Sequence, residues 1–386
     1  MKKIAFVITL FCFAEVLPAQ ADVSCRLRIS LLTCSPGDEL YSTFGHSALR
    51  VIDSEAHTDI VYNYGTFDFD DPSFYTKFAR GKLLYFVSID TIDGFLYEYR
   101  YFHRGVIEQV LQLSCPGKEK LVTALQENAK EENKYYKYDF IYDNCTTRLR
   151  DMVFKNSDGP VVTKNILPKP GITFRNLIHD YLNKSGQYWS KLGIDILLGA
   201  PLDKKVSNNE AMFLPDYLLK GFDSTEITGH DLVMEKKHIL IPVVQSERNS
   251  WFTPFTVFAI LFLIICALSV FGNAAKFFAV FDFVLFFLTG VLGVLLLFMW
   301  FGTDHPECKN NLNLAWAFPL HFIGVFFLYR ELRWMKFYFL FNSVLLLALL
   351  LFWKWLPQEL NAALIPVVCL LLLRSFARYK SGPHGR

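Results

Sequence analysis

Hydrophobic and polar residues are distributed unevenly along the chain, which divides near residue 250. Before that point, apolar residues recur in short runs between charged and turn residues, which is typical of a soluble domain that mixes strands and helices. Beyond it, five apolar runs approach the length of a bilayer-spanning helix. They lie near 254–272, 279–301, 312–329, 337–353 and 359–373. The pattern predicts an α+β domain over 22–250 and an all-α bundle of five transmembrane helices over 251–374.

Within the first part, several runs have the alternation and turn residues of β-strands. They are residues 26–34, 44–53, 59–69, 84–90 and 105–113. The second and third are joined by SEAHT, so we expect a β-hairpin. Helices are predicted from Pro116 to about Asn133 and from YDNCTTRLRDMVF, where Asp143 or Asn144 would be the N-cap.

The start of the chain has the features of a secretory signal peptide over 1–21. Two lysines precede an apolar run that ends in the small residues Ala19-Gln20-Ala21. Glu15 is unusual in such a segment, so an uncleaved anchor is the alternative. The first large domain would then be periplasmic.

The positive charges of the loops support the same orientation. With 22–250 outside, eight Lys and Arg residues face the cytoplasm, some of them in a basic tail over 375–386. Only Lys309 and Lys354 lie in the outer loops, as the positive-inside rule requires. We therefore predict a multi-pass protein of the bacterial inner membrane with a cytoplasmic C-terminus.

Composition narrows the classes of function. A hydrophobic content of 52% exceeds that of ordinary soluble domains. The net charge of +2 gives no indication of a nucleic-acid partner. Five of the eight cysteines would face the periplasm, and this odd number leaves at least one unpaired within the chain. They are Cys25, Cys34, Cys115, Cys145 and Cys308; a pair among the first three is plausible, but the connectivity stays open.

Cys145 is the candidate nucleophile. It lies in the first turn of the helix that begins after the Asp-Asn pair, where free amides and the helix dipole favour a thiolate. His46, at the start of a predicted strand and after Gly45, is the candidate general base and acid. A buried or disulfide-bonded Cys145 and a packed strand histidine are the structural alternatives.

A third residue should orient His46, and Asn63 is the candidate. If the hairpin pairs symmetrically about SEAH, Asn63 lies on the same face as His46. A slip of one residue would place Tyr62 or Tyr64 there instead.

Arg148 and Arg150 are candidate phosphate ligands one turn beyond the thiol. Ion pairs with Asp143 and Asp151 are the alternative for these two. His305 is a candidate substrate contact, in an outer loop expected to cover the site. Asp304, His305 and Cys308 form only a weak metal pattern, so neither a metal nor another cofactor is expected.

Four segments of the chain together resemble the Lnb-type bacterial lipoprotein N-acyltransferases. They are SLLTCSPGDELYSTFGHSALRV, YDFIYDNCTTRLRD, GIDILLGAPLDKKVSNNEAMFLPDYL and TDHPECKNNLNLAWAFPLH. The resemblance implies a circularly permuted papain-like fold, related to the NlpC and lecithin:retinol acyltransferase type. It places the family's catalytic cysteine at Cys145 and its histidine at His46.

The resemblance also implies an activity. Such an enzyme would move a fatty acyl chain from a membrane phospholipid, through a cysteine thioester, to the α-amine of the lipidated N-terminal cysteine of diacylated lipoproteins. The alternative is a membrane-bound papain-like cysteine hydrolase, either a cell-wall peptidase or a phospholipase. Five spans argue against the peptidase, and the intact FGH and NCTT stretches argue against a non-enzymatic scaffold.

Overall fold

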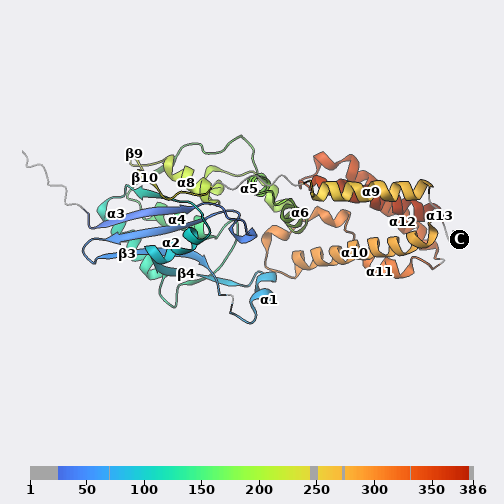
Figure 1. The fold of residues 1–386 in the computed structure, drawn as a ribbon, viewed down its shortest axis with the longest axis horizontal. Coiled ribbons are helices and arrows are strands. Elements are labelled where there is room, and N and C mark those ends of the chain that lie inside the picture. The colour runs from blue at the N-terminus through green and yellow to red at the C-terminus, as the bar shows by residue number, and fades with distance from the viewer. Residues whose placement is uncertain (1–24, 69, 244–250, 272–273, 331, 382–386) are drawn as a thin grey trace, which may run out of the picture.

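The computed structural model describes residues 25–68, 70–243, 251–271, 274–330 and 332–381. The predicted signal peptide therefore lies outside the described residues. Figure 1 shows a sheet domain at one end, a bundle of long helices at the other, and helices α5 and α6 between them. The coarse prediction of an α+β domain followed by a helical membrane region is confirmed.

The N-terminal domain contains a seven-stranded antiparallel sheet in the order β10-β5-β1-β2-β3-β4-β6. Its strands are β1 (Leu27–Cys34), β2 (His46–Asp53), β3 (Thr58–Thr66), β4 (Leu84–Thr91), β5 (Val106–Leu111), β6 (Tyr135–Lys137) and β10 (Val233–Leu240). A small second sheet contains β7 (Val161–Thr163), β8 (Thr225–Ile227) and β9 (His230–Asp231). The five predicted strands and the β2–β3 hairpin are confirmed.

Helices cover both faces of the large sheet. The helices of this domain are α1 (Phe74–Ala79), α2 (Ile92–Tyr101), α3 (Cys115–Asn128), α4 (Cys145–Lys155), α5 (Phe174–Lys184), α6 (Tyr188–Leu197), α7 (Asn208–Ala211) and α8 (Pro215–Asp223). Of these, α2 packs on one face of the sheet, and α3, α4 and α8 pack on the other. Side chains alternate across β1, so Ile29 and Leu31 pack with α3, α4 and α8, whereas Leu32 and Cys34 pack with α2. The two apolar layers hold the sheet in place.

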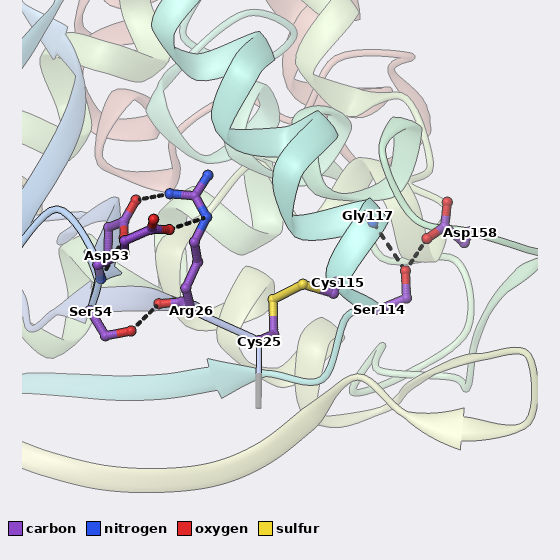
Figure 2. Close-up of a disulfide and its surroundings, with 9 residues drawn as sticks. Cys25, Arg26, Asp53, Ser54, Ser114, Cys115, Gly117 and Asp158 are labelled. Carbon is purple, nitrogen blue, oxygen red and sulfur yellow. Dashed lines mark hydrogen bonds and ion pairs between the residues drawn. A yellow bond between two sulfur atoms is a disulfide. The ribbon is translucent and has the colours of Figure 1, made fainter. Parts of the chain in front are cut away.

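A disulfide joins the beginning of the described chain to α3 (Figure 2). Cys25 and Cys115 are bonded, which gives the pairing that the sequence left open, while Cys34, Cys145 and Cys308 are free thiols. Next to it, Ser114 caps α3 by accepting a hydrogen bond from the amide of Gly117. The disulfide fixes the beginning of α3 to the residues that precede β1.

The membrane part does not confirm the prediction of five spanning helices. Among the described residues, four helices are long and apolar enough to cross a bilayer. They are α9 (Pro254–Phe271), α10 (Ala275–Phe301), α12 (Arg333–Leu351) and the stretch Ala362–Lys380, which covers all but the last residue of α13 (Ile365–Ser381). The helix α13 therefore extends into the segment predicted as the basic tail.

The predicted third span, 312–329, is broken into short pieces. They are η4 (Leu312–Ala315), α11 (His321–Gly324) and η5 (Val325–Phe327). Pro319 lies between the first two and has no amide hydrogen to continue a helix. Irregular backbone at membrane depth needs protein around it, and this segment packs on two glycines of α10. A Cβ at Gly290 would lie 2.2 Å from the amide nitrogen of Phe322, and one at Gly293 would lie 2.1 Å from the carbonyl oxygen of Ala317.

The broken segment nevertheless runs the length of the bundle. At one end, Asn313 Nδ2 donates to the carbonyl of Asp195 in α6 (2.8 Å). At the other end, the hydroxyl of Tyr329 donates to the carbonyl of Ala279, near the beginning of α10. The broken segment thus lies alongside α10, and α13 ends far from the sheet domain (Figure 1).

At that far end, a buried carboxylate joins two helices. Asp282 of α10 accepts hydrogen bonds from Arg374 Nε (2.6 Å) and Arg378 Nε (2.5 Å) of α13. Asp282 is fully buried and Arg374 nearly so. Two of the predicted cytoplasmic charges therefore belong to an ion-pair cluster.

A buried polar network fixes the sheet domain to the bundle. The carboxylate of Asp195 accepts hydrogen bonds from Arg175 Nη1 (2.8 Å), His179 Nε2 (2.7 Å) and Asn361 Nδ2 (2.8 Å). Gln358 Nε2 adds a bond to the carbonyl of Leu198 (3.1 Å). Arg175 has 1% of its side chain exposed and Asp195 none, so this pair is satisfied within the protein.

Candidate active site

Asn144 fixes the beginning of α4. Its Oδ1 accepts from the amide of Thr147 (2.9 Å), and Thr147 Oγ1 accepts from the amide of Asn144 (2.8 Å). Its Nδ2 also donates to the carbonyl of Phe213 (2.9 Å). Of the two predicted N-caps, Asn144 is therefore the cap. Cys145 follows it as the first residue of the helix, where backbone amides are free to bind an anion.

Gly45 allows the backbone to turn tightly just before His46. It has φ of +79°, which favours glycine, and a Cβ there would lie 2.6 Å from the carbonyl oxygen of Cys34. His46 then begins β2, opposite Cys34 of β1. Gly45 thus lets the backbone of Cys34 come close to the beginning of β2.

The thiol lies where β2 and β3 separate. Their ladder runs from the Asp53–Thr58 pair to the Leu49–Tyr62 pair and stops before His46. A Cβ on Gly65 of β3 would lie 3.6 Å from the Cβ of Cys145.

The side chains of Cys145 and His46 lie next to each other, within reach of a hydrogen bond, so each shifts the pKa of the other. The backbone amides of Ser47 and Thr146 also lie near the sulfur of Cys145, where they favour the thiolate. The beginning of α4 thus meets the opened ends of both strands.

The electrostatics of this pair favour separated charges. Burial alone would raise the pKa of the Cys145 thiol, but the charge of His46, the hydrogen bond between them and the two amides outweigh burial and lower this pKa. Burial alone would lower the pKa of His46, but the Cys145 thiolate and the hydrogen bonds from Cys145 and Asn63 raise it. Each residue thus stabilises the charged form of the other, as in a thiolate–imidazolium pair.

Asn63 lies on the predicted hairpin face. His46 Nε2–H donates to Asn63 Oδ1 at 2.6 Å. The register, with Leu49 opposite Tyr62, is the symmetric one, so Tyr62 and Tyr64 point to the other face and belong to the large core. With Nε2 engaged, Nδ1 is the ring nitrogen left for the thiol.

The other predicted contacts lie in different surroundings. Arg148 is paired with Asp143 (Nε to Oδ1, 2.6 Å), and its guanidinium lies 3.5 Å from the centre of the Tyr136 ring. Arg150 is paired with Asp151 (2.7 Å). Both arginines thus form the ion pairs that the sequence offered as the alternative to phosphate binding. A role of either one in binding phosphate stays a prediction.

The outer loop after α10 contacts the sheet domain. His305 Nε2 bonds to the carbonyl of Phe78 (3.0 Å), and Asp304 pairs with Lys137 (3.0 Å). Burial and the neighbouring carboxylate of Asp139 raise the pKa of Glu307 to about 7. Among the described residues, no group of three or more His, Cys, Asp or Glu side chains is placed to hold a metal ion.

Sequence reasoning missed three contributors to the site. Gly65 lies at a β-bulge with φ of +92° beside the thiol. An isolated glycine within a strand pattern is a known signal of a bulge and could have identified it. The amide of Ser47 gave no signal because any residue carries one. Tyr138 lies beside Gly65, with a Cβ there 3.8 Å from its ring, a contact that only the fold creates.

Two family models match the chain. The Lnb N-terminal periplasmic domain matches residues 17–179, and the Lnb transmembrane domain matches residues 246–381. The first match contains both members of the Cys145–His46 pair. No curated protein and no solved structure matches. From the two matches in this order, and from a sheet domain followed by long apolar helices, the chain belongs to the Lnb family of membrane proteins with a periplasmic N-terminal domain.

Proposed function

We propose that this protein is a lipoprotein N-acyltransferase. It takes a fatty acyl chain from a membrane phospholipid and transfers it to the α-amine of the lipidated N-terminal cysteine of diacylated lipoproteins. The observation that supports this proposal is the position of Cys145 at the beginning of α4 beside His46, in a domain fixed to a membrane bundle by the Asp195 network. Membership of the Lnb family supports it.

In the first half-reaction, the Cys145 thiolate attacks the ester carbonyl of the phospholipid. A carbon–sulfur bond forms, the ester carbon–oxygen bond breaks, and the protonated His46 gives its proton to the departing lysophospholipid alkoxide. The amide of Cys145, in the first turn of α4, is the proposed donor to the oxyanion. Asn63 acts as a positioning residue through its bond to His46.

In the second half-reaction, the amine of the lipoprotein cysteine attacks the thioester. A carbon–nitrogen bond forms, the carbon–sulfur bond breaks, and the amine proton passes to His46, which restores the starting ion pair. This ping-pong course needs only one nucleophile and one base.

The proposal includes a location and a fold relationship. The bundle lies in the bacterial inner membrane, with the sheet domain in the periplasm and the C-terminus in the cytoplasm, as the signal-peptide pattern and the loop charges indicate. Both the phospholipid and the lipoprotein are then available at the outer leaflet. A thiol at a helix start beside a strand histidine is also the arrangement expected of a permuted papain-like domain.

The test is complementation of a bacterial strain that lacks its own N-acyltransferase. The wild-type chain should add a third acyl chain to lipoproteins, read by mass spectrometry of their N-terminal peptides. Cys145→Ala should add none, whereas Cys308→Ala, which removes another buried free thiol, should act as the wild type does.

Other results of this test would change the proposal. If the wild type adds no chain, the proposed reaction is wrong. A third chain added by Cys145→Ala would keep the reaction but exclude this nucleophile. Release of free fatty acid or of a cleaved peptide without an acceptor would identify the hydrolase instead.

A further inference from the structure

A row of aromatic rings runs through the sheet domain near α1. Successive ring centres are 6.2 Å apart from Phe78 to Phe74, 5.7 Å from Phe74 to Phe67, 5.2 Å from Phe67 to Tyr85 and 4.3 Å from Tyr85 to Tyr138. Phe67, Tyr85 and Tyr138 are all partly exposed. We call these five residues the aromatic row.

The inner end of the aromatic row lies at the thiol. The Tyr138 ring and the Cys145 Cβ both contact the space in which a Cβ of Gly65 would lie, at 3.8 and 3.6 Å. Gly65 therefore brings the Tyr138 ring and the thiol to opposite sides of one residue that has no side chain of its own.

The outer end of the aromatic row lies on α1, which is held at the outer end of a membrane helix. The carbonyl of Phe78 bonds to His305, and the carbonyl of Arg80 accepts from the amide of Asp304 (2.9 Å), just beyond the end of α10. Tyr75 and Phe78 are 81% and 53% exposed. Figure 1 shows α1 beside the end of α10 that faces the sheet domain.

The charges around α1 match a bilayer surface. Lys77, Arg80 and Lys82 are exposed next to the exposed rings, with Lys77 paired with Asp71 (2.6 Å) and with Asp68 and Asp70 exposed nearby in the chain. Aromatic rings with neighbouring cations are typical of segments that lie in the interface of a membrane. The aromatic row therefore connects the level of the bilayer surface to the nucleophile.

From this path we infer that the aromatic row binds the acyl chain of the donor phospholipid, with the ester carbonyl at Cys145 and the tail running along Tyr138, Tyr85 and Phe67 toward α1. The inference rests on the proposed function and names the site that holds its donor. The occupant is the transferred chain because its carbonyl carbon becomes bonded to the sulfur, so its first methylenes must lie beside Cys145. The chains of the lipoprotein are attached through the acceptor and have no such requirement.

The test isolates the first half-reaction. The full-length chain is placed in vesicles of phosphatidylethanolamine with equal amounts of saturated 12-, 14-, 16- and 18-carbon acyl chains, without a lipoprotein. Acyl adducts on Cys145 are quantified by intact-protein mass spectrometry and confirmed as thioesters by release with hydroxylamine. The ratio of short to long chains is the readout, because a purely structural defect lowers total adduct without altering this ratio.

Phe67→Trp enlarges a ring in the middle of the row, so the ratio should shift toward short chains by about threefold or more. Tyr85→Leu, which removes a ring, is the second variant if Phe67→Trp fails to fold, and it should change the ratio by a similar factor. Tyr97→Trp is the matched control, since Tyr97 is 71% exposed on α2, and it should keep the wild-type ratio.

The outcomes separate this inference from the proposed function. An adduct whose chain-length ratio is the same in wild type, Phe67→Trp and Tyr85→Leu would overturn the role of the aromatic row and leave the acyltransferase proposal standing. No adduct on wild-type Cys145 would overturn both.

Discussion

At the scale of single residues, the sequence predicted directly that Cys145 and His46 would lie together, while their catalytic roles belong to the proposed function. Cys145 followed from helix-start chemistry and His46 from a glycine-preceded strand start, since both signals are local. Asn63 needed only the register of one hairpin, and the structure has that register. The amide of Ser47 and the ring of Tyr138 could not be predicted, because they reach the thiol only through strand separation and the crossing of distant segments.

The Cys145–His46 pair predicts a distinctive pH dependence of alkylation. Because His46 lowers the pKa of Cys145, iodoacetamide should modify Cys145 at pH 7, while Cys34 and Cys308, whose pKa values burial raises to about 12, stay unmodified. His46→Ala leaves burial opposed only by the amides, so the midpoint should move to higher pH and the rate at pH 7 should fall by about 10- to 100-fold.

The measurement is peptide mass spectrometry of alkylated protein from pH 5 to 10. Asn63→Ala is the intermediate case: it removes one of the bonds that raise the pKa of His46, so the ion pair should be lost at a lower pH than in wild type. Identical alkylation profiles for wild type and His46→Ala would contradict the ion pair.

At the scale of elements, the beginning of α4 shows how a cap decides the position of a nucleophile. The sequence left Asp143 and Asn144 as equal candidates, because both have a suitable side-chain oxygen. The fold distinguishes them. Asn144 Nδ2 also donates to the carbonyl of Phe213, which is distant in the sequence. Asp143 instead pairs with Arg148 at the surface.

The two residues should therefore differ in their effect on stability. Asn144→Ala removes the cap and leaves buried partners unsatisfied, so it should lower the free energy of unfolding by about 1–2 kcal/mol. Asp143→Ala breaks only a partly exposed ion pair, so its effect should stay below about 1 kcal/mol. Thermal unfolding of the full-length variants measures both, and equal losses would show that Asn144 is not the dominant cap.

At the scale of the whole molecule, two of the four segments that resemble the Lnb family meet at one joint, the contact between the sheet domain and the bundle. Residues of GIDILLGAPLD and of CKNNLNLAW meet where Asn313 binds Asp195, so both segments are needed to fix the domain to the bundle. The sequence located the four long apolar helices, but it also predicted a fifth at 312–329, because an apolar run does not distinguish a continuous helix from a broken one. The break at Pro319 is stabilised by glycines about thirty residues earlier.

The contact between Glu307 and Asp139 should make this joint sensitive to pH. The pKa of Glu307 is raised from 4.5 to about 7 in the folded protein, so its stabilising contribution is complete below pH 4.5 and is lost as the pH rises through 7. Glu307→Gln keeps a neutral side chain at every pH. Relative to wild type, the free energy of unfolding of this variant should increase by on the order of 1–2 kcal/mol between pH 5 and pH 8.

Melting temperatures of the two proteins at pH 5, 6, 7 and 8 provide the measurement. Glu119→Gln, at an exposed residue of α3, is the control and should follow the wild type at each pH. If Glu307→Gln and wild type keep a constant difference over this range, the carboxyl pair does not act on stability.

The Asp282 cluster also sets an order for biogenesis. The ribosome delivers α10 to the membrane before α13, because Asp282 precedes Arg374 by 92 residues. During that interval the carboxylate has neither arginine as a counter-ion, and a charge held without a partner in lipid is unfavourable. Insertion of the last helix is therefore the step that completes the bundle, and nascent chains that end before Arg374 should be the ones that quality-control proteases remove.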